Sequence, residues 1–296
     1  MRKLIYLTVF TALLTSCGSS NDEPDAWGNF ESKEIMLASE TSGKILGMMV
    51  EQGERVNSGE LIAITDTAMF KLQLAELEAG RNSVMTKLSS IDAQNRIIEQ
   101  QINNLRVNIE RVESMLLDKA ATQKQLDDLT GQLRVFEKQK EANNSQKLTI
   151  RSELEVFNSR EAMLTEQLER CYIKSPSEGT VLEKYAEAGE ITATGKPIVK
   201  IADLDNMELK VYISGAQLGQ IKLGQECRVR IDRGEKDYTE FTGKIFHISD
   251  KAEFTPKIIQ TKEERVHMVY ALKIRVKNDG SLKNGMPAEA FFGNAN

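Results

Sequence analysis

The feature that most constrains this chain is a long stretch that avoids helix-breaking residues. Residues 67–171 contain no proline and only two glycines, Gly80 and Gly131. Because proline breaks a helix interior and glycine weakens it, this composition favours long uninterrupted helices. In the first half of the stretch, apolar residues recur every seven positions in two interleaved series, whose members are Phe70, Leu77, Val84, Ile91, Ile98, Leu105 and Val112, and Leu74, Leu88, Ile102, Ile109 and Leu116, with polar exceptions at Arg81 and Asn95 in the second series. Such spacing over about six heptads predicts one helix of a coiled coil.

The heptad pattern breaks at residues 118–121 and then resumes. Thr122 followed by Gln125 fits the capping box that opens a helix. The resumed series contain Leu126, Leu133, Leu154 and Leu168, and Leu129, Phe136, Ile150, Phe157, Leu164 and Cys171, with polar exceptions at Lys140, Asn143, Lys147 and Glu161. Two helices of similar length joined by a short turn predict an antiparallel hairpin. At 1.5 Å per residue, about 50 residues per helix give a rod of roughly 75 Å.

The polar residues that interrupt the apolar series of the two predicted helices should lie at the same levels along the hairpin. If the turn is centred near Lys119, residues whose numbers sum to about 238 face each other across the hairpin. Asn95 then lies opposite Asn143, and Arg81 lies within a turn of Glu161. A polar pair inside an apolar seam costs stability but fixes the register of two helices. We therefore expect these four residues to set the register of the hairpin.

The segments on either side of the helical stretch resemble each other. Residues 42–66 and 178–203 both alternate apolar residues between glycine-containing turns, and Gly53 aligns with Gly189. This pattern is typical of short strands, and each half is too small to fold alone. The two halves should pack into one small β-sandwich across the inserted hairpin. Further alternating segments and turn signals after residue 203 predict a small antiparallel barrel.

The N-terminus has the pattern of an export signal. Residues 1–17 join a short basic start to an apolar segment too short to span a bilayer, and they end in Leu-Thr-Ser-Cys. That ending resembles the site at which bacterial lipoproteins are acylated, so Cys17 is the predicted lipid attachment point. Residues 18–35 are predicted to be a polar tether and membrane-proximal segment. The alternative is an ordinary secreted protein in which Cys17 is incidental.

The composition argues against several classes of function. A net charge of −5, one tryptophan and two histidines make a nucleic-acid-binding protein a poor interpretation. The three cysteines form no C-x-x-C pair, so no metal site is predicted. No nucleophile and base are arranged as in known catalytic motifs, and no cofactor is expected. The chain is therefore predicted not to be an enzyme.

Taken together, these segments resemble the periplasmic adaptor, or membrane-fusion, family of the haemolysin-secretion (HlyD) type. The implied fold is elongated multidomain α+β, in which a coiled-coil hairpin is inserted in a split lipoyl-like β-sandwich and a small antiparallel β-barrel follows. The corresponding domains are lipoyl-like half 1 (36–66), the hairpin (67–171), lipoyl-like half 2 (172–203) and the barrel (204–296). In acyl-carrier domains the modified lysine lies between the two halves, where this chain has its hairpin. An enzyme carrier domain is therefore a weaker alternative.

The resemblance also implies a docking site at the hairpin tip. The family pattern places an arginine, an apolar residue, a small residue and a second apolar residue where this chain has Arg111, Met115, Thr122 and Leu126. Met115 departs from the usual leucine. Two simpler interpretations stay open: Arg111 as one more solvated helix residue, and Thr122 as an N-cap alone.

Adaptors of this family bridge a pump and a channel. The resemblance implies an inner-membrane ABC-type exporter and a TolC-like outer-membrane channel as partners, a ring of identical copies that is expected to be a hexamer, and a periplasmic protein anchored to the inner membrane by its lipid. Residues 254–295 look especially like adaptors of ABC-type exporters, and little sequence follows the barrel. The alternatives are the adaptor of a proton-driven (RND) pump and a coiled-coil envelope scaffold lipoprotein that has no part in transport.

Overall fold

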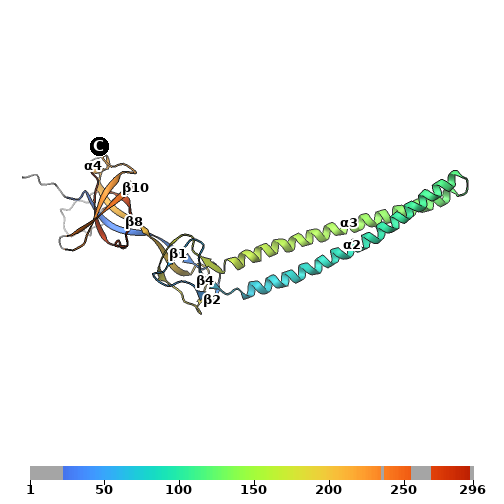
Figure 1. Ribbon diagram of the computed structural model, residues 1–296, viewed down its shortest axis with the longest axis horizontal. Helices are drawn as coiled ribbons and strands as arrows, with labels where there is room; N and C mark the ends of the chain where they lie inside the picture. The colour runs from blue at the N-terminus through green and yellow to red at the C-terminus, as the bar shows by residue number, and fades with distance from the viewer. Residues whose placement is uncertain (1–22, 235–236, 255–267, 294–296) are drawn as a thin grey trace, which may run out of the picture. The chain divides into compact units, whose positions relative to one another are not determined.

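The computed structural model describes residues 23–234, 237–254 and 268–293, which form two compact units (Figure 1). We call them the hairpin unit and the β unit. The hairpin unit comprises residues 36–177 and 183–200, and the β unit comprises the described parts of residues 1–35, 178–182 and 201–296. The predicted signal peptide and Cys17 lie outside the described residues.

Two long helices dominate the hairpin unit. Helix α2 (Ala68–Leu117) and helix α3 (Gln123–Glu169) run antiparallel along each other (Figure 1). Their buried residues all belong to the heptad series and are Val84, Ile91, Ile98, Ile102, Leu105 and Ile150. Other members of the series, such as Leu88 and Phe157, are half-buried against Val84, Ile91 and Ile150. The long helical hairpin predicted from the heptads is confirmed.

A tight turn joins the two helices. Lys119 adopts the left-handed conformation, with φ of +58°. Thr122 is the N-cap of α3: its backbone amide donates to Gln125 Oε1 at 2.8 Å, and the Gln125 amide donates to Thr122 Oγ1 at 3.4 Å. This reciprocal pair satisfies two of the amides that a helix start leaves without partners.

A small sheet holds the base of the hairpin. Its strands, in spatial order, are β5 (Tyr172–Lys174), β4 (Leu61–Thr65), β2 (Gly43–Met48) and β7 (Ile191–Thr192), while β3 (Arg55–Val56) lies between β2 and β4 in sequence. Strands that precede the hairpin thus pair with strands that follow it. Ala63 lies opposite Ile173, and Gly43 lies opposite Thr192. The two ends of the helical insertion are therefore fixed beside each other.

The two similar sequence segments also share their turn geometry. Gly53 and Gly189, which align, have φ of +86° and +95°. Only glycine adopts this conformation without strain, which accounts for its presence at both positions. The turn around each glycine is closed by an equivalent backbone hydrogen bond, of 3.1 Å in the first segment and 3.2 Å in the second.

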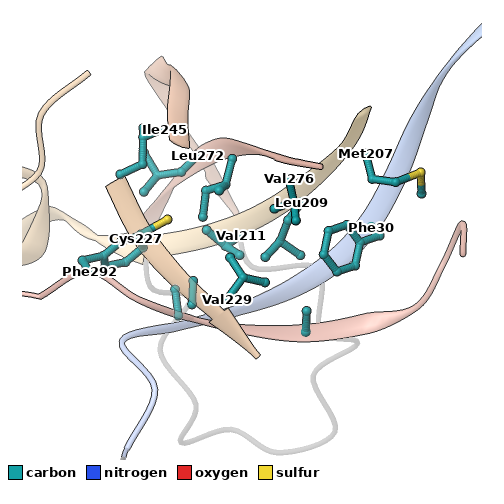
Figure 2. Close-up of a cluster of buried hydrophobic side chains, with 14 of the residues drawn as sticks. Phe30, Met207, Leu209, Val211, Cys227, Val229, Ile245, Leu272, Val276 and Phe292 are labelled. Atoms are coloured by element: carbon teal, nitrogen blue, oxygen red, sulfur yellow. The ribbon is translucent and has the colours of Figure 1, made fainter. Parts of the chain in front are cut away.

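The β unit is built around a closed circuit of strands. The circuit runs β1 (Ala26–Ala38), β12 (Pro287–Phe291), β9 (Glu226–Asp232), β10 (Tyr238–Phe254), β11 (Met268–Lys277) and β8 (Pro197–Ser214), and β8 pairs again with β1. Strand β6 (Gly179–Lys184) lies on the other side of β8, and the short helix α4 (Gly215–Leu218) follows β8. Inward-facing side chains, among them Phe30, Leu209, Val211, Val229 and Leu272, form the core of this unit (Figure 2).

The start of β1 corrects one sequence prediction. A tether and membrane-proximal segment was predicted for residues 18–35, and the barrel was assigned to residues 204–296 alone. Strand β1 instead begins at Ala26 and supplies one strand of the circuit. The reason is packing, because Ala26 and Phe30 are both buried in the core of the β unit.

Candidate functional site: the hairpin tip and seam

The four residues of the predicted docking pattern lie at one end of the hairpin. Arg111 and Met115 are exposed in the last two turns of α2. Leu126 is half-buried in the first turn of α3. Thr122 is exposed, but its hydroxyl is already engaged in the capping box described above. The tip therefore presents a guanidinium and apolar side chains to solvent.

Leu117 is a tip residue that the docking pattern did not include. It is the last residue of α2, and 85% of its surface is exposed. Single exposed leucines are common on protein surfaces, so exposure alone assigns no role. The signal in the sequence was an apolar residue next to the predicted turn and outside both heptad series. Together with Met115, it adds exposed apolar surface beside the guanidinium of Arg111.

The two asparagines of the seam are hydrogen-bonded to each other. Asn143 Nδ2 donates to Asn95 Oδ1 at 3.1 Å, and Asn95 Nδ2 donates to Asn144 Oδ1 at the same distance. Asn95 and Asn143 are both partly buried. An amide that loses its partner at such a position keeps the desolvation cost without the bond. A slip of either helix would therefore be unfavourable.

The second predicted polar pair also meets across the hairpin. Arg81 Nη1 lies 2.9 Å from Glu161 Oε2, and the two side chains are 34% and 47% exposed. An ion pair this accessible to water contributes less than about 1 kcal/mol. The pair is more informative about register than about stability. It is a second polar contact between α2 and α3, closer to the base of the hairpin, that fits the same register as the asparagines.

Two further ion pairs flank the asparagines. Lys140 Nζ lies 2.9 Å from Glu99 Oε1, and Lys147 donates to Asp92. The hydrogen bond from Lys147 lowers the pKa of Asp92 below its usual value. The sequence marked both lysines as heptad exceptions but missed their partners, because Glu99 and Asp92 lie one position beyond the apolar series. All four polar exceptions of α3 therefore have a polar partner on α2.

Within the described ranges, no group of three or more His, Cys, Asp or Glu residues is placed to hold a metal ion. Burial raises the pKa of the Cys227 thiol to about 12, which leaves it protonated and unreactive at neutral pH. None of the helices in the described part of the chain is long and apolar enough to cross a membrane.

Comparison with known sequences gives distant relatives of nearly the same length. No family model matches the chain. A UPF0194 membrane protein of Yersinia enterocolitica is 26% identical over 98% of this chain and 98% of its own length. Another UPF0194 membrane protein, from Acidithiobacillus ferridurans, is 23% identical over 88% of this chain and 84% of its own.

Solved structures share the fold over most of the chain. The crystal structure of MacA from Actinobacillus actinomycetemcomitans matches 90% of this chain and 76% of its own, with a TM-score of 0.56 and 22% identity. The membrane fusion protein Spr0693 from Streptococcus pneumoniae R6 matches 91% of this chain and 98% of its own, with a TM-score of 0.52 and 19% identity. The resemblance that the sequence indicated is therefore confirmed at the level of the fold: this chain has the fold of the membrane-fusion, or periplasmic adaptor, family.

Proposed function

We propose that this chain is a periplasmic adaptor that bridges an inner-membrane ABC-type exporter to a TolC-like outer-membrane channel. The observation that carries the proposal is the long helical hairpin, fixed at its base by a small sheet and ending in an exposed tip. The fold shared with MacA and with the membrane fusion protein Spr0693 supports it. The role is structural: the adaptor positions its partners and contributes no chemistry of its own.

The two β modules have corresponding roles in this proposal. We assign the four-stranded sheet at the base of the hairpin to the split lipoyl-like domain, because its strands come from both sides of the insertion. The closed strand circuit of the β unit is assigned to the β-barrel, now including β1. Copies of the chain are proposed to form a ring, with six as the number implied by the family.

The tip is proposed to dock onto the channel through Arg111, Met115, Thr122 and Leu126. Changing Arg111 to aspartate should abolish or strongly reduce export, because reversing a charge at a contact turns attraction into repulsion. The measurement is growth of a deletion strain on compounds whose export requires the wild-type chain, with recovery of the cross-linked channel as a second readout. Since Arg111 is exposed, the thermal stability of the variant should not change.

Arg134→Asp is the matched control for this experiment. Arg134 is another exposed arginine, on α3 and farther from the turn than Arg111. It changes the net charge by the same amount, so export should persist. Normal export by a stably expressed Arg111→Asp chain would place the docking contact elsewhere.

Membrane attachment is proposed to occur through a lipid on Cys17. Replacing Cys17 with serine should leave the precursor unprocessed or release the protein from the membrane fraction. Fractionation followed by mass spectrometry of the N-terminus measures both outcomes. A Cys17→Ser chain that is cleaved normally and stays with the membrane would contradict lipidation and favour an ordinary secretion signal.

The inner-membrane partner is proposed to be of the ABC type, because of the sequence resemblance noted for residues 254–295. Neighbouring genes discriminate the alternatives. Genes for an ABC permease, an ATPase and an outer-membrane channel would support this proposal. A proton-driven pump gene would favour the RND adaptor, and the absence of any transporter gene would favour an envelope scaffold.

A further inference from the structure

One end of the strand circuit in the β unit carries the only tryptophan of the chain and an exposed leucine. Trp27 lies at the start of β1 and is 62% exposed, and Leu223, between α4 and β9, is 67% exposed. Tryptophan is on average a largely buried residue, so an exposed tryptophan is more informative than a single exposed leucine. We call this end, which consists of the start of β1, helix α4 and residues 219–225, the N-terminal rim.

A series of hydrogen bonds through Asp25 holds the parts of the N-terminal rim together. The Gln217 side chain of α4 donates to the Asp25 carbonyl at 2.9 Å. The Phe292 amide donates to the Asp25 carboxylate at 2.7 Å, and the Gln225 side chain donates to the Phe292 carbonyl at 2.8 Å. Asp25 and Gln225 each lie two residues from one of the exposed apolar side chains. The tryptophan and the leucine therefore belong to one connected framework.

The carboxylate next to Trp27 is neutralised. In the strand ladder Trp27 lies opposite Glu289 of β12. The Arg230 guanidinium donates to Glu289 at 2.8 Å and is 7% exposed. Lys222, beside Leu223, is exposed, and a lysine keeps its ammonium group in water while its aliphatic stem lies along apolar surface. The tryptophan can therefore leave bulk water without taking an unpaired carboxylate with it.

The length of chain before the rim indicates what the rim faces. Asp25 is eight residues along the chain from Cys17, the proposed lipid attachment point. A fully extended chain spans at most about 3.6 Å per residue, so the lipid places Asp25 within about 29 Å of the bilayer surface. So short a connection gives the rim a roughly millimolar effective concentration at the bilayer, at which even a weak affinity for lipid produces binding.

Tryptophan and leucine are side chains that a bilayer interface accepts. An indole ring is favoured at the level of the lipid headgroups, because its body is apolar while its N–H group finds hydrogen-bond partners there. A leucine gains by transfer from water to hydrocarbon. Two such side chains on one folded rim fix an orientation as well as an attachment, which an acyl chain eight residues away does not.

We propose that the N-terminal rim enters the headgroup region of the bilayer through Trp27 and Leu223, as a second membrane contact beside the lipid on Cys17. This inference rests on the proposed lipidation of Cys17, which brings the rim within reach, and extends it by assigning lipid binding to a surface of the folded protein. The orientation of the β unit on the membrane is then set by the chain itself, before any partner binds.

The intrinsic fluorescence of the protein tests this contact, because Trp27 is the only tryptophan in the chain. The full chain, purified with its lipid, is reconstituted into phosphatidylcholine vesicles that contain no other protein. Lipids that carry bromine high on their acyl chains quench an indole that lies at the headgroup level. Trp27 emission in brominated vesicles should therefore be about twofold lower than in unbrominated vesicles.

A chain with Trp27→Phe and Tyr238→Trp is the matched control. Tyr238 is 53% exposed and begins β10, which in this antiparallel circuit lies at the opposite end from the start of β1. Its ring stacks on the Arg230 guanidinium, and an indole ring can keep that contact. Brominated lipid should not quench this chain. Equal quenching of both chains would overturn the rim as the contact surface.

Charge substitution gives a second, independent readout. Leu223→Glu should remove most of the quenching of Trp27, because a carboxylate resists entry into the bilayer. The protein should still float with the vesicles, since its lipid is intact. Leu148→Glu, at a similarly exposed position of α3 (62%), should leave both the quenching and the flotation unchanged.

The outcomes separate this inference from the proposed lipidation. A chain that floats with the vesicles while Trp27 stays unquenched would overturn the rim contact and leave the lipid anchor standing. Trp27 emission that changes only when the inner-membrane transporter is added would place protein, and not lipid, against the rim. A mass spectrum without an acyl group on Cys17 would contradict the lipidation and this inference together.

Discussion

Replacing Gly28 with alanine is expected to lower the stability of the β unit by about 3 kcal/mol or more. A Cβ at this position would lie 1.8 Å from the carbonyl oxygen of Lys210 and 2.9 Å from the Cα of Val211. Both are backbone atoms of β8, so no side-chain rotation can relieve the overlap. The strands β1 and β8 would have to separate, and their pairing is the contact that closes the strand circuit.

The midpoint of urea unfolding, followed by far-UV circular dichroism, measures this loss. Gly219→Ala is the control within the same unit, because nothing lies within 4 Å of the added methyl group and φ is −66°. It should change the stability by less than about 1 kcal/mol. Unchanged unfolding of Gly28→Ala would mean that β1 does not approach β8 as closely as described.

Replacing both Asn95 and Asn143 with leucine is expected to raise the stability of the hairpin by about 2 kcal/mol while loosening its register. Each leucine extends the apolar seam, and burying it gains more than the lost amide hydrogen bond contributed. Slipped registers become more accessible, because sliding one helix along the other would no longer bury an unpaired amide against leucine or isoleucine. Thermal unfolding measures the first effect, and distances between spin labels on the two helices measure the second.

The single substitutions sharpen this prediction. Asn95 bonds both Asn143 and Asn144, whereas Asn143 bonds Asn95. Asn95→Leu should therefore destabilise the hairpin more than Asn143→Leu, since the latter leaves Asn95 with one partner. A lower melting temperature for the double variant, or equal effects of the two single variants, would contradict the assigned role of the pair.

Much of the hairpin could be predicted because its determinants are local. Heptad spacing is set within each helix, and a capping box involves residues three apart, so α2, α3 and the N-cap Thr122 follow from short segments. The level of Asn95 against Asn143 also followed, since an antiparallel hairpin with a known turn has one simple register. The internal repeat indicated which segments had to meet at the base.

The features that were missed depend on contacts between distant segments or lie just outside a pattern. The circuit needs β1 to pair with both β12 and β8, and a short alternating run such as Ala26–Phe30 does not indicate its neighbours. Asp92 and Glu99 were missed because the heptad rule selects seam positions, while long lysine side chains reach one position further. Leu117 is exposed and lies outside the heptad series, so the pattern of core residues does not predict a role for it.

The strand pairing at the base of the hairpin has a consequence for how the chain folds. The Thr65 amide donates to the Cys171 carbonyl at 2.9 Å, across more than a hundred intervening residues. Closing a flexible loop of that length by random search would cost roughly 4 kcal/mol of chain entropy. If the helices instead zip together from the turn at Lys119, every step joins residues that the previous step has already brought close. Formation of the hairpin would then bring β4 next to β5. Slow formation of the turn would therefore delay the assembly of a sheet some fifty residues away along each helix.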